Sequence, residues 1–111
     1  MKNIKGDYKM LKMIIELNEE KIVKENEYYL NDVLSYVDSY FEKKNIKKVG
    51  KGIYQEEEDD KLIQFLGIMT RLSEQDIFVR YINKWMWYES EEAILHNEPE
   101  DLMKTFELKV S

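Results

Sequence analysis

The clearest signal in this sequence is a helical repeat of apolar residues between Asn26 and Lys44. The apolar side chains recur at intervals of three and four residues, at Leu30, Val33, Leu34, Val37 and Phe41. This spacing predicts an amphipathic α-helix whose apolar face packs against a core. Asn26 is a candidate for the N-terminal cap of the helix, and Asn45 for a left-handed residue that ends it.

Two segments of strand type flank this helix. Residues 10–17 contain the β-branched pair Ile14 and Ile15, and residues 46–55 combine apolar residues with two glycines of the kind found at bulges. Residues 21–24 fit either a return strand or the approach to the helix.

Residues 61–72 fit both a helix and a strand. Leucine, phenylalanine and methionine recur there at helical spacing, whereas the β-branched residues and Gly67 in the middle favour a strand. We predict a strand that pairs with residues 46–55 across an acidic turn, with a helix as the alternative.

The last third of the chain is predicted to form two helices and a strand. Ser73 to Asp76 is a variant of the capping box, and the helix after it, to about Tyr88, would bury Phe78, Tyr81, Ile82 and Trp85. The segment 98–101 has the signature of a second helix start, with proline and acidic residues in the first turn. Alternation of apolar and charged residues over 106–110 predicts a final strand.

The predicted order of elements is β-α-β-β-α-β, with a short extra helix near the C-terminus. This is the order of a ferredoxin-like α+β sandwich. The 111 residues suffice for one domain, residues 1–111, rather than for two. Hydrophobic residues make up 43% of the chain, which is too many for a disordered protein.

The residue inventory excludes several classes of active site. The chain has no cysteine, so disulfides, zinc thiolate sites, iron–sulfur ligation and cysteine nucleophiles are excluded. His96 is the only histidine, and the four glycines lack the spacing of a phosphate-binding loop. We therefore predict no metal, no cofactor and no catalytic residue, and we interpret His96 as a surface residue.

Charge is divided unevenly along the chain. Residues 1–55 contain 11 Lys against 9 acidic residues, whereas residues 56–111 contain 6 Lys or Arg against 14 acidic residues. The second half therefore carries a net charge of −8 in a chain whose total is −6. Such an asymmetry indicates an acidic surface that binds a partner, or an ordinary solvated surface.

The acidic residues gather in two clusters that are candidate protein-binding sites. The first is the predicted turn formed by Glu56, Glu57, Glu58, Asp59 and Asp60. The second spans residues 89–101 and includes Glu89, Glu91 and Glu92. If the clusters meet in space, their carboxylates form one negative face that imitates the phosphates of a nucleic acid. The alternative is that both are solvated loops that keep the strands from aggregating.

Trp87 and Tyr88 lie between the two clusters and are candidate anchors. On the predicted helix Trp87 falls outside the buried stripe and is therefore exposed. Tryptophan and tyrosine are frequent hot spots of protein interfaces. The alternative is that the helix ends near Trp85 and that Trp87 folds under the following loop.

Five lysines form a competing site, at Lys43, Lys44, Lys47, Lys48 and Lys51. They could contact phosphates, with Tyr54 or Phe65 stacking on bases if one face of the sheet is open. The chain is acidic overall and has no arginine in this segment, so direct nucleic-acid binding is the less favoured hypothesis.

In size, acidity and excess of lysine over arginine, the chain resembles the small accessory proteins of bacterial mobile elements and phages. That group includes anti-CRISPR and anti-restriction inhibitors. The resemblance is one of composition, covers the second half of the chain, and rests on residues 56–60, 85–88 and 89–101. It implies a protein that binds and blocks a nucleic-acid-handling machine, and it carries over no residue role.

The sequence thus predicts a non-catalytic, cytoplasmic protein whose carboxylates occupy a basic nucleic-acid channel on a larger protein. The alternatives are a nucleic-acid-binding protein that uses the lysines, and a homo-oligomeric accessory subunit. Neither a signal peptide nor a membrane-spanning stretch is visible in the sequence.

Overall fold

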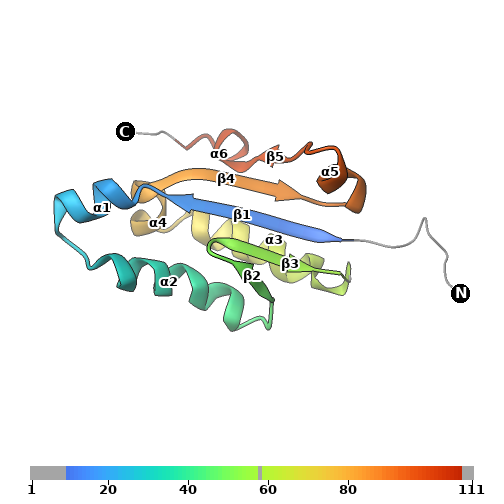
Figure 1. The fold of residues 1–111 in the computed structure, drawn as a ribbon, viewed down its shortest axis with the longest axis horizontal. Coiled ribbons are helices and arrows are strands. Elements are labelled where there is room, and N and C mark those ends of the chain that lie inside the picture. The colour runs from blue at the N-terminus through green and yellow to red at the C-terminus, as the bar shows by residue number, and fades with distance from the viewer. Residues whose placement is uncertain (1–9, 58, 109–111) are drawn as a thin grey trace, which may run out of the picture.

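The structure is a computed structural model that describes residues 10–57 and 59–108. Within these residues the strands form one antiparallel sheet in the order β2-β3-β1-β4-β5 (Figure 1). The strands are β1 (Leu11–Leu17), β2 (Lys48–Gly50), β3 (Ile53–Glu56), β4 (Ile82–Tyr88) and β5 (Glu100–Asp101). The helices are α1 (Glu19–Glu25), α2 (Leu30–Glu42), the 3₁₀ turn η2 (Asp59–Lys61), α3 (Leu62–Ser73), α4 (Asp76–Tyr81), α5 (Glu91–Leu95) and α6 (Leu102–Thr105).

The predicted α+β class is confirmed. Strands β1 to β4 and the helices between them also follow the β-α-β-β-α-β order, with β1 and β3 inside the sheet. However, several of these strands and helices are formed by other residues than the sequence predicts. The hairpin of β2 and β3 lies wholly within residues 48–56, and its turn contains Gly52 at a φ of 70°.

Residues 62–73 form the helix α3, so the predicted strand over 61–72 is wrong. Both edges of β3 are already occupied, by β2 on one side and β1 on the other, so the segment cannot pair with β3. The buried residues of α3 follow helical spacing instead, at Phe65, Ile68, Met69 and Leu72.

The helix predicted after Ser73 ends at Tyr81, and residues 82–88 form the strand β4. Pairing with β1 along six residue pairs, from Lys12–Tyr88 to Leu17–Ile82, decides this conformation. The predicted capping box is also wrong, because Ser73 ends α3 and Gln75 precedes α4 without a side-chain cap.

The turn and cap predictions have mixed outcomes. Asn26 ends α1 in a left-handed conformation rather than beginning the next helix, whereas Asn45 is left-handed as predicted. The short C-terminal helix starts at Leu102, later than predicted, with the Asp101 carboxylate as its cap. Residues 106–108 are not a strand, and the rest of the predicted strand lies outside the described residues.

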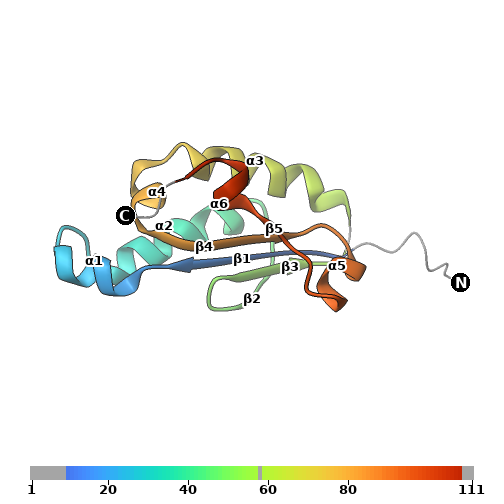
Figure 2. The same ribbon diagram turned by 90° about the horizontal axis from the view of Figure 1, so that it is seen from above.

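Most of the core lies on one face of the sheet, under α2, α3 and α4 (Figure 2). Alternate residues of β1 point into this core, from Leu11 to Leu17, because successive side chains of a strand alternate between faces. From α2, Phe41 stacks on Tyr54 of β3 with ring centroids 3.7 Å apart. On the opposite face Ile14 pairs with Ile53 and Met86, all three half-buried.

None of the helices in the described segments has the length and apolar character needed to cross a bilayer.

Candidate functional site

Trp87 and Tyr88 are buried, so the prediction that Trp87 is exposed is wrong. Their side chains are 2% and 6% exposed. Because β4 is a strand, Trp87 points to the same face as Trp85, and its ring lies 4.9 Å from that of Phe65. Tyr88 points to the opposite face, where its hydroxyl donates to Oδ1 of Asn97 at 2.8 Å. Neither residue is available as an exposed anchor.

The first acidic cluster begins inside the sheet. Glu56 is the last residue of β3, and its carboxylate accepts a hydrogen bond from the backbone N–H of Lys47 at 2.8 Å. Glu57 is exposed, Glu58 lies outside the described residues, and Asp59 and Asp60 begin η2. Glu56 therefore helps to close the hairpin, and Glu57 and Asp60 present exposed side chains.

The second acidic cluster is organised by α5. Ser90 caps this helix by accepting a hydrogen bond from the backbone N–H of Ala93 at 3.0 Å. Glu91 and Glu92 precede Leu95 by four and three residues, so they lie on its side of the helix. The Leu95 side chain is 74% exposed. An apolar side chain thus stands in solvent beside two carboxylates.

Two further carboxylates flank this helix. The backbone N–H of Glu98 donates to the carbonyl of Ala93 at 2.8 Å, which folds Glu98 back against the end of α5. Glu89 precedes the cap, and its Oε1 accepts a hydrogen bond from Trp87 at 3.4 Å. We refer to the exposed residues Glu89, Glu91, Glu92, Leu95 and Glu98 as the α5 acidic surface.

The carboxylates of the α5 acidic surface have no cationic partner within the described segments. The ion pairs of those segments use Glu19, Glu25, Glu27 and Asp38. The negative charge at α5 is therefore balanced by solvent ions or by a partner molecule.

The two acidic clusters lie at the same end of the molecule but do not form one face. Figure 2 shows η2 and the start of α3 on the helix-covered side of the sheet, and α5 on the other side. The sheet separates them, so a partner that contacts both clusters has to reach around its edge.

The five lysines do not form one free cationic patch. Lys43, Lys44 and Lys47 are exposed, but Lys48 pairs with Asp38 at 2.7 Å and Lys51 pairs with Glu19 at 2.6 Å. The aromatic rings proposed for base stacking are also inaccessible, because Tyr54 is 1% exposed and Phe65 is fully buried. The stacking part of the nucleic-acid hypothesis is therefore wrong.

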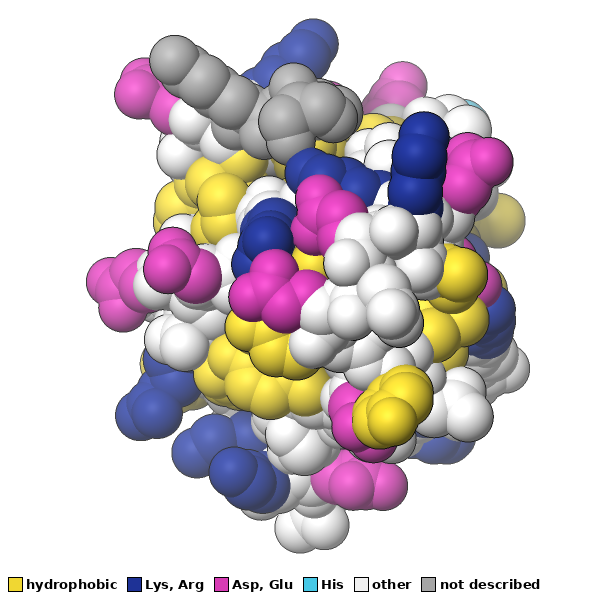
Figure 3. All heavy atoms as spheres, turned by 90° about the vertical axis from the view of Figure 1, so that its left-hand side faces the viewer, with side chains coloured by type: hydrophobic (Ala, Val, Ile, Leu, Met, Phe, Trp, Pro, Cys, Tyr) yellow, Lys and Arg dark blue, Asp and Glu magenta, His cyan; other side chains and the backbone are white. Residues whose placement is uncertain are grey.

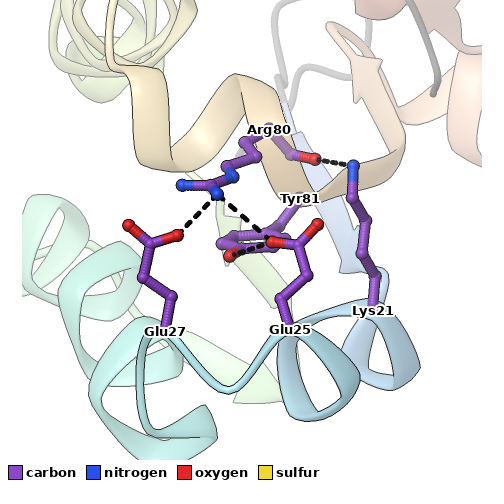
Figure 4. A network of polar contacts seen from close by, with 5 residues as sticks. All are labelled: Lys21, Glu25, Glu27, Arg80 and Tyr81. Atoms are coloured by element: carbon purple, nitrogen blue, oxygen red, sulfur yellow. Dashed lines mark hydrogen bonds and ion pairs between the residues drawn. The ribbon is translucent and has the colours of Figure 1, made fainter.

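A polar network that the sequence did not predict joins α1 to α4 (Figure 4). The Arg80 guanidinium lies 2.6 Å from Glu27 and 3.4 Å from Glu25, and Lys21 donates to the Arg80 carbonyl at 3.1 Å. The buried Tyr81 hydroxyl donates to Glu25 at 2.7 Å. Burial, reinforced by this hydrogen bond, raises the pKa of Tyr81 to about 12.

The surface at this end of the molecule mixes charges of both signs. Figure 3 shows Lys and Arg side chains interspersed with Asp and Glu, around patches of apolar atoms. No local motif could have indicated the network, because residues 21–27 meet residues 80 and 81 only after the chain has folded.

His96 is exposed and directly follows α5. Across residues 10–57 and 59–108, no group of three or more His, Asp or Glu side chains is arranged to hold a metal ion. In comparisons with known proteins, no protein-family model matches the chain and no curated protein matches its sequence.

Proposed function

We propose that the chain is a non-catalytic, cytoplasmic protein-interaction module that binds a basic surface through the α5 acidic surface. The supporting observation is an exposed leucine among four carboxylates that have no cationic partner in the described segments. Central apolar contacts contribute affinity, and the surrounding charges contribute specificity and rate of encounter.

The partner we propose is a nucleic-acid-handling protein of the kind that mobile-element and phage inhibitors block. Such proteins expose grooves rich in lysine and arginine that bind phosphates. Carboxylates at the groove would pair with the same cations and exclude the nucleic acid. The start of α3 lies at the same end of the molecule as α5 (Figure 1), so the exposed Glu57 and Asp60, which shortly precede α3 in the chain, would add to the negative potential there.

Capture of partners from a bacterial lysate tests this proposal when it is combined with matched variants. The site variant carries Glu91→Gln, Glu92→Gln and Glu98→Gln. The control variant carries Glu20→Gln, Glu42→Gln and Glu74→Gln, three exposed residues away from α5. Both variants change the net charge from −6 to −3, so they differ only in where the charge is lost.

The proposal predicts that the native chain and the control variant capture the same basic, nucleic-acid-binding protein, and that the site variant does not. Equal capture by both variants would contradict it. Capture of nucleic acid alone would favour the lysine hypothesis instead. That hypothesis has less support, because two of the five lysines are paired and the stacking rings are buried.

A further inference from the structure

A cavity of about 360 Å³ lies beside β1, next to the first residues of β3. β3 pairs with Leu11–Ile14 of β1, and the turn that leads from β2 into β3 lies just beyond this pairing. The backbone N–H of Ile15 donates to the carbonyl of Gly52 at 2.8 Å, which closes this edge of the pairing. Beyond this point β1 remains paired with β4 on one side, and on the side where β3 is missing it lines the cavity.

One wall of the cavity is formed by the hairpin turn, which lies close against β1. Gly52 has a φ of 70°, and a Cβ placed on it would lie 2.1 Å from the carbonyl oxygen of Ile15. Only glycine lets the turn approach β1 this closely. The course of the backbone at this turn therefore shapes the cavity. Its apolar lining comes from β1, α2 and β3 and includes Ile15, Leu17, Leu34, Val37, Ile53 and Tyr54.

The charged side chains around this apolar lining are already paired. Lys51 lies 2.6 Å from Glu19, and Lys48 lies 2.7 Å from Asp38. The second oxygen of Asp38 accepts a hydrogen bond from Tyr54 at 2.5 Å. Both lysines are thus neutralised, whereas the carboxylate of Glu16, which also lines the cavity, has no ion pair within the described residues.

We propose that this cavity binds a small, largely apolar molecule that is neutral or carries a positive charge. Its volume falls within the range of small-molecule sites, and such sites are apolar with a few placed polar groups. The lining carries one more carboxylate than lysines, which disfavours an anion. The proposal concerns a different surface from α5 and stands independently of the protein partner.

Two fluorescent probes with the same aromatic skeleton test both parts of the proposal. N-phenyl-1-naphthylamine is neutral, and 8-anilinonaphthalene-1-sulfonate adds one sulfonate to it. We expect saturable, one-to-one binding of the neutral probe with enhanced fluorescence. We expect binding of the sulfonate to be weaker by about tenfold or more, because its charge meets an unpaired carboxylate.

Substitutions that fill the cavity locate the binding site. Leu34→Trp adds a ring at a half-buried position of α2 that lines the cavity. Ile53→Trp makes the same change from β3 and is the second filler, used if Leu34→Trp does not fold. Leu95→Trp, on exposed α5, is the control. We expect the fillers to abolish binding of the neutral probe and the control to retain it.

Absence of saturable binding to the native chain would overturn the proposal, as would binding that survives both fillers. Equal affinity for the two probes would overturn its charge preference. Because none of these variants alters a carboxylate of the α5 acidic surface, failure here leaves the result of the capture experiment unaffected.

Discussion

The two ends of the molecule are both rich in acidic residues, but their carboxylates have different surroundings. At the end formed by α1 and α4, Glu25 and Glu27 share the guanidinium of Arg80 (Figure 4). At the end that carries α5, Glu91, Glu92 and Glu98 have no cationic neighbour among the described residues. The two ends therefore differ in whether their carboxylates have an internal cation, and we propose that this difference separates a structural cluster from a binding surface.

The largest predicted effect distinguishes Trp87, a buried residue of β4, from Leu95, the exposed apolar residue of the α5 acidic surface. Trp87→Ala removes a buried ring and is expected to lower the free energy of unfolding by about 3–5 kcal/mol. Leu95→Ala removes an exposed side chain and is expected to change it by less than about 0.5 kcal/mol while weakening partner capture. Chemical denaturation measures both. Similar small losses in the two variants would contradict the assignment of Trp87 to the core.

The next effect concerns the paired end. Tyr81→Phe removes the hydroxyl that donates to Glu25 and leaves the buried ring in place. Loss of a hydrogen bond to a charged group predicts a decrease of about 1.5 kcal/mol in the free energy of unfolding. The isosteric change Tyr29→Phe, at a residue that is 79% exposed, is the control and should have no effect in the same denaturation series.

Alkaline pH is expected to destabilise the protein in a manner that depends on Tyr81. Its pKa is raised from 10.0 to about 12 in the folded state, so the folded chain holds the phenolic proton more tightly than the unfolded chain does. The resulting stabilisation is complete below about pH 10 and is lost as the pH rises towards 12. Thermal melts at increasing pH should show a falling Tm. A fall of the same steepness in the Tyr81→Phe variant would contradict this account.

A smaller effect is expected from the cation that joins Glu25 to Glu27. Arg80→Gln removes it and should lower the Tm slightly, with the difference shrinking at high salt because exposed charges are screened. Lys84→Gln changes the net charge equally at an exposed position on β4. A Tm for Arg80→Gln that matches this control would show that the network does not stabilise the fold.

The smallest effect on stability is expected at α5. Replacing Glu91, Glu92 and Glu98 together by glutamine removes charges that have no partner in the described segments, so the free energy of unfolding should change by less than about 0.5 kcal/mol. Loss of partner capture in a variant of native stability would assign these carboxylates to binding. A large loss of stability would instead place them, like Glu25 and Glu27, in the structural class.

The sequence predicted elements well where the apolar pattern alone decides the conformation. Val33, Val37 and Phe41 of α2 are buried as the helical spacing predicts. It failed for residues 82–88, because the spacing of Phe78, Tyr81, Ile82 and Trp85 also fits a helix and only pairing with β1 makes the segment a strand. The predicted order of elements nevertheless matches the structure. β3 takes the place of the strand that was wrongly predicted at 61–72, and β4 takes the place of the predicted final strand.

The candidate site was predictable only in part. The cluster of acidic residues over 89–101 follows from composition, whereas the helix α5 and its cap at Ser90 were not predicted. The burial of Trp87 does not follow from composition, because it depends on which face of β4 the ring occupies. The cavity beside β1 has no signature in the sequence, since it arises from the different lengths of β1 and β3.

The central claim, that the α5 acidic surface binds a basic protein, is tested most directly by the affinity for the captured partner at two salt concentrations. The screening length falls from about 10 Å at 0.1 M to about 3 Å at 1 M salt. The account predicts a steep loss of affinity for the native chain, and weak binding with little salt dependence for the variant that lacks the charges of Glu91, Glu92 and Glu98. An affinity that is the same at both salt concentrations, or the same in the native chain and the variant, would contradict it.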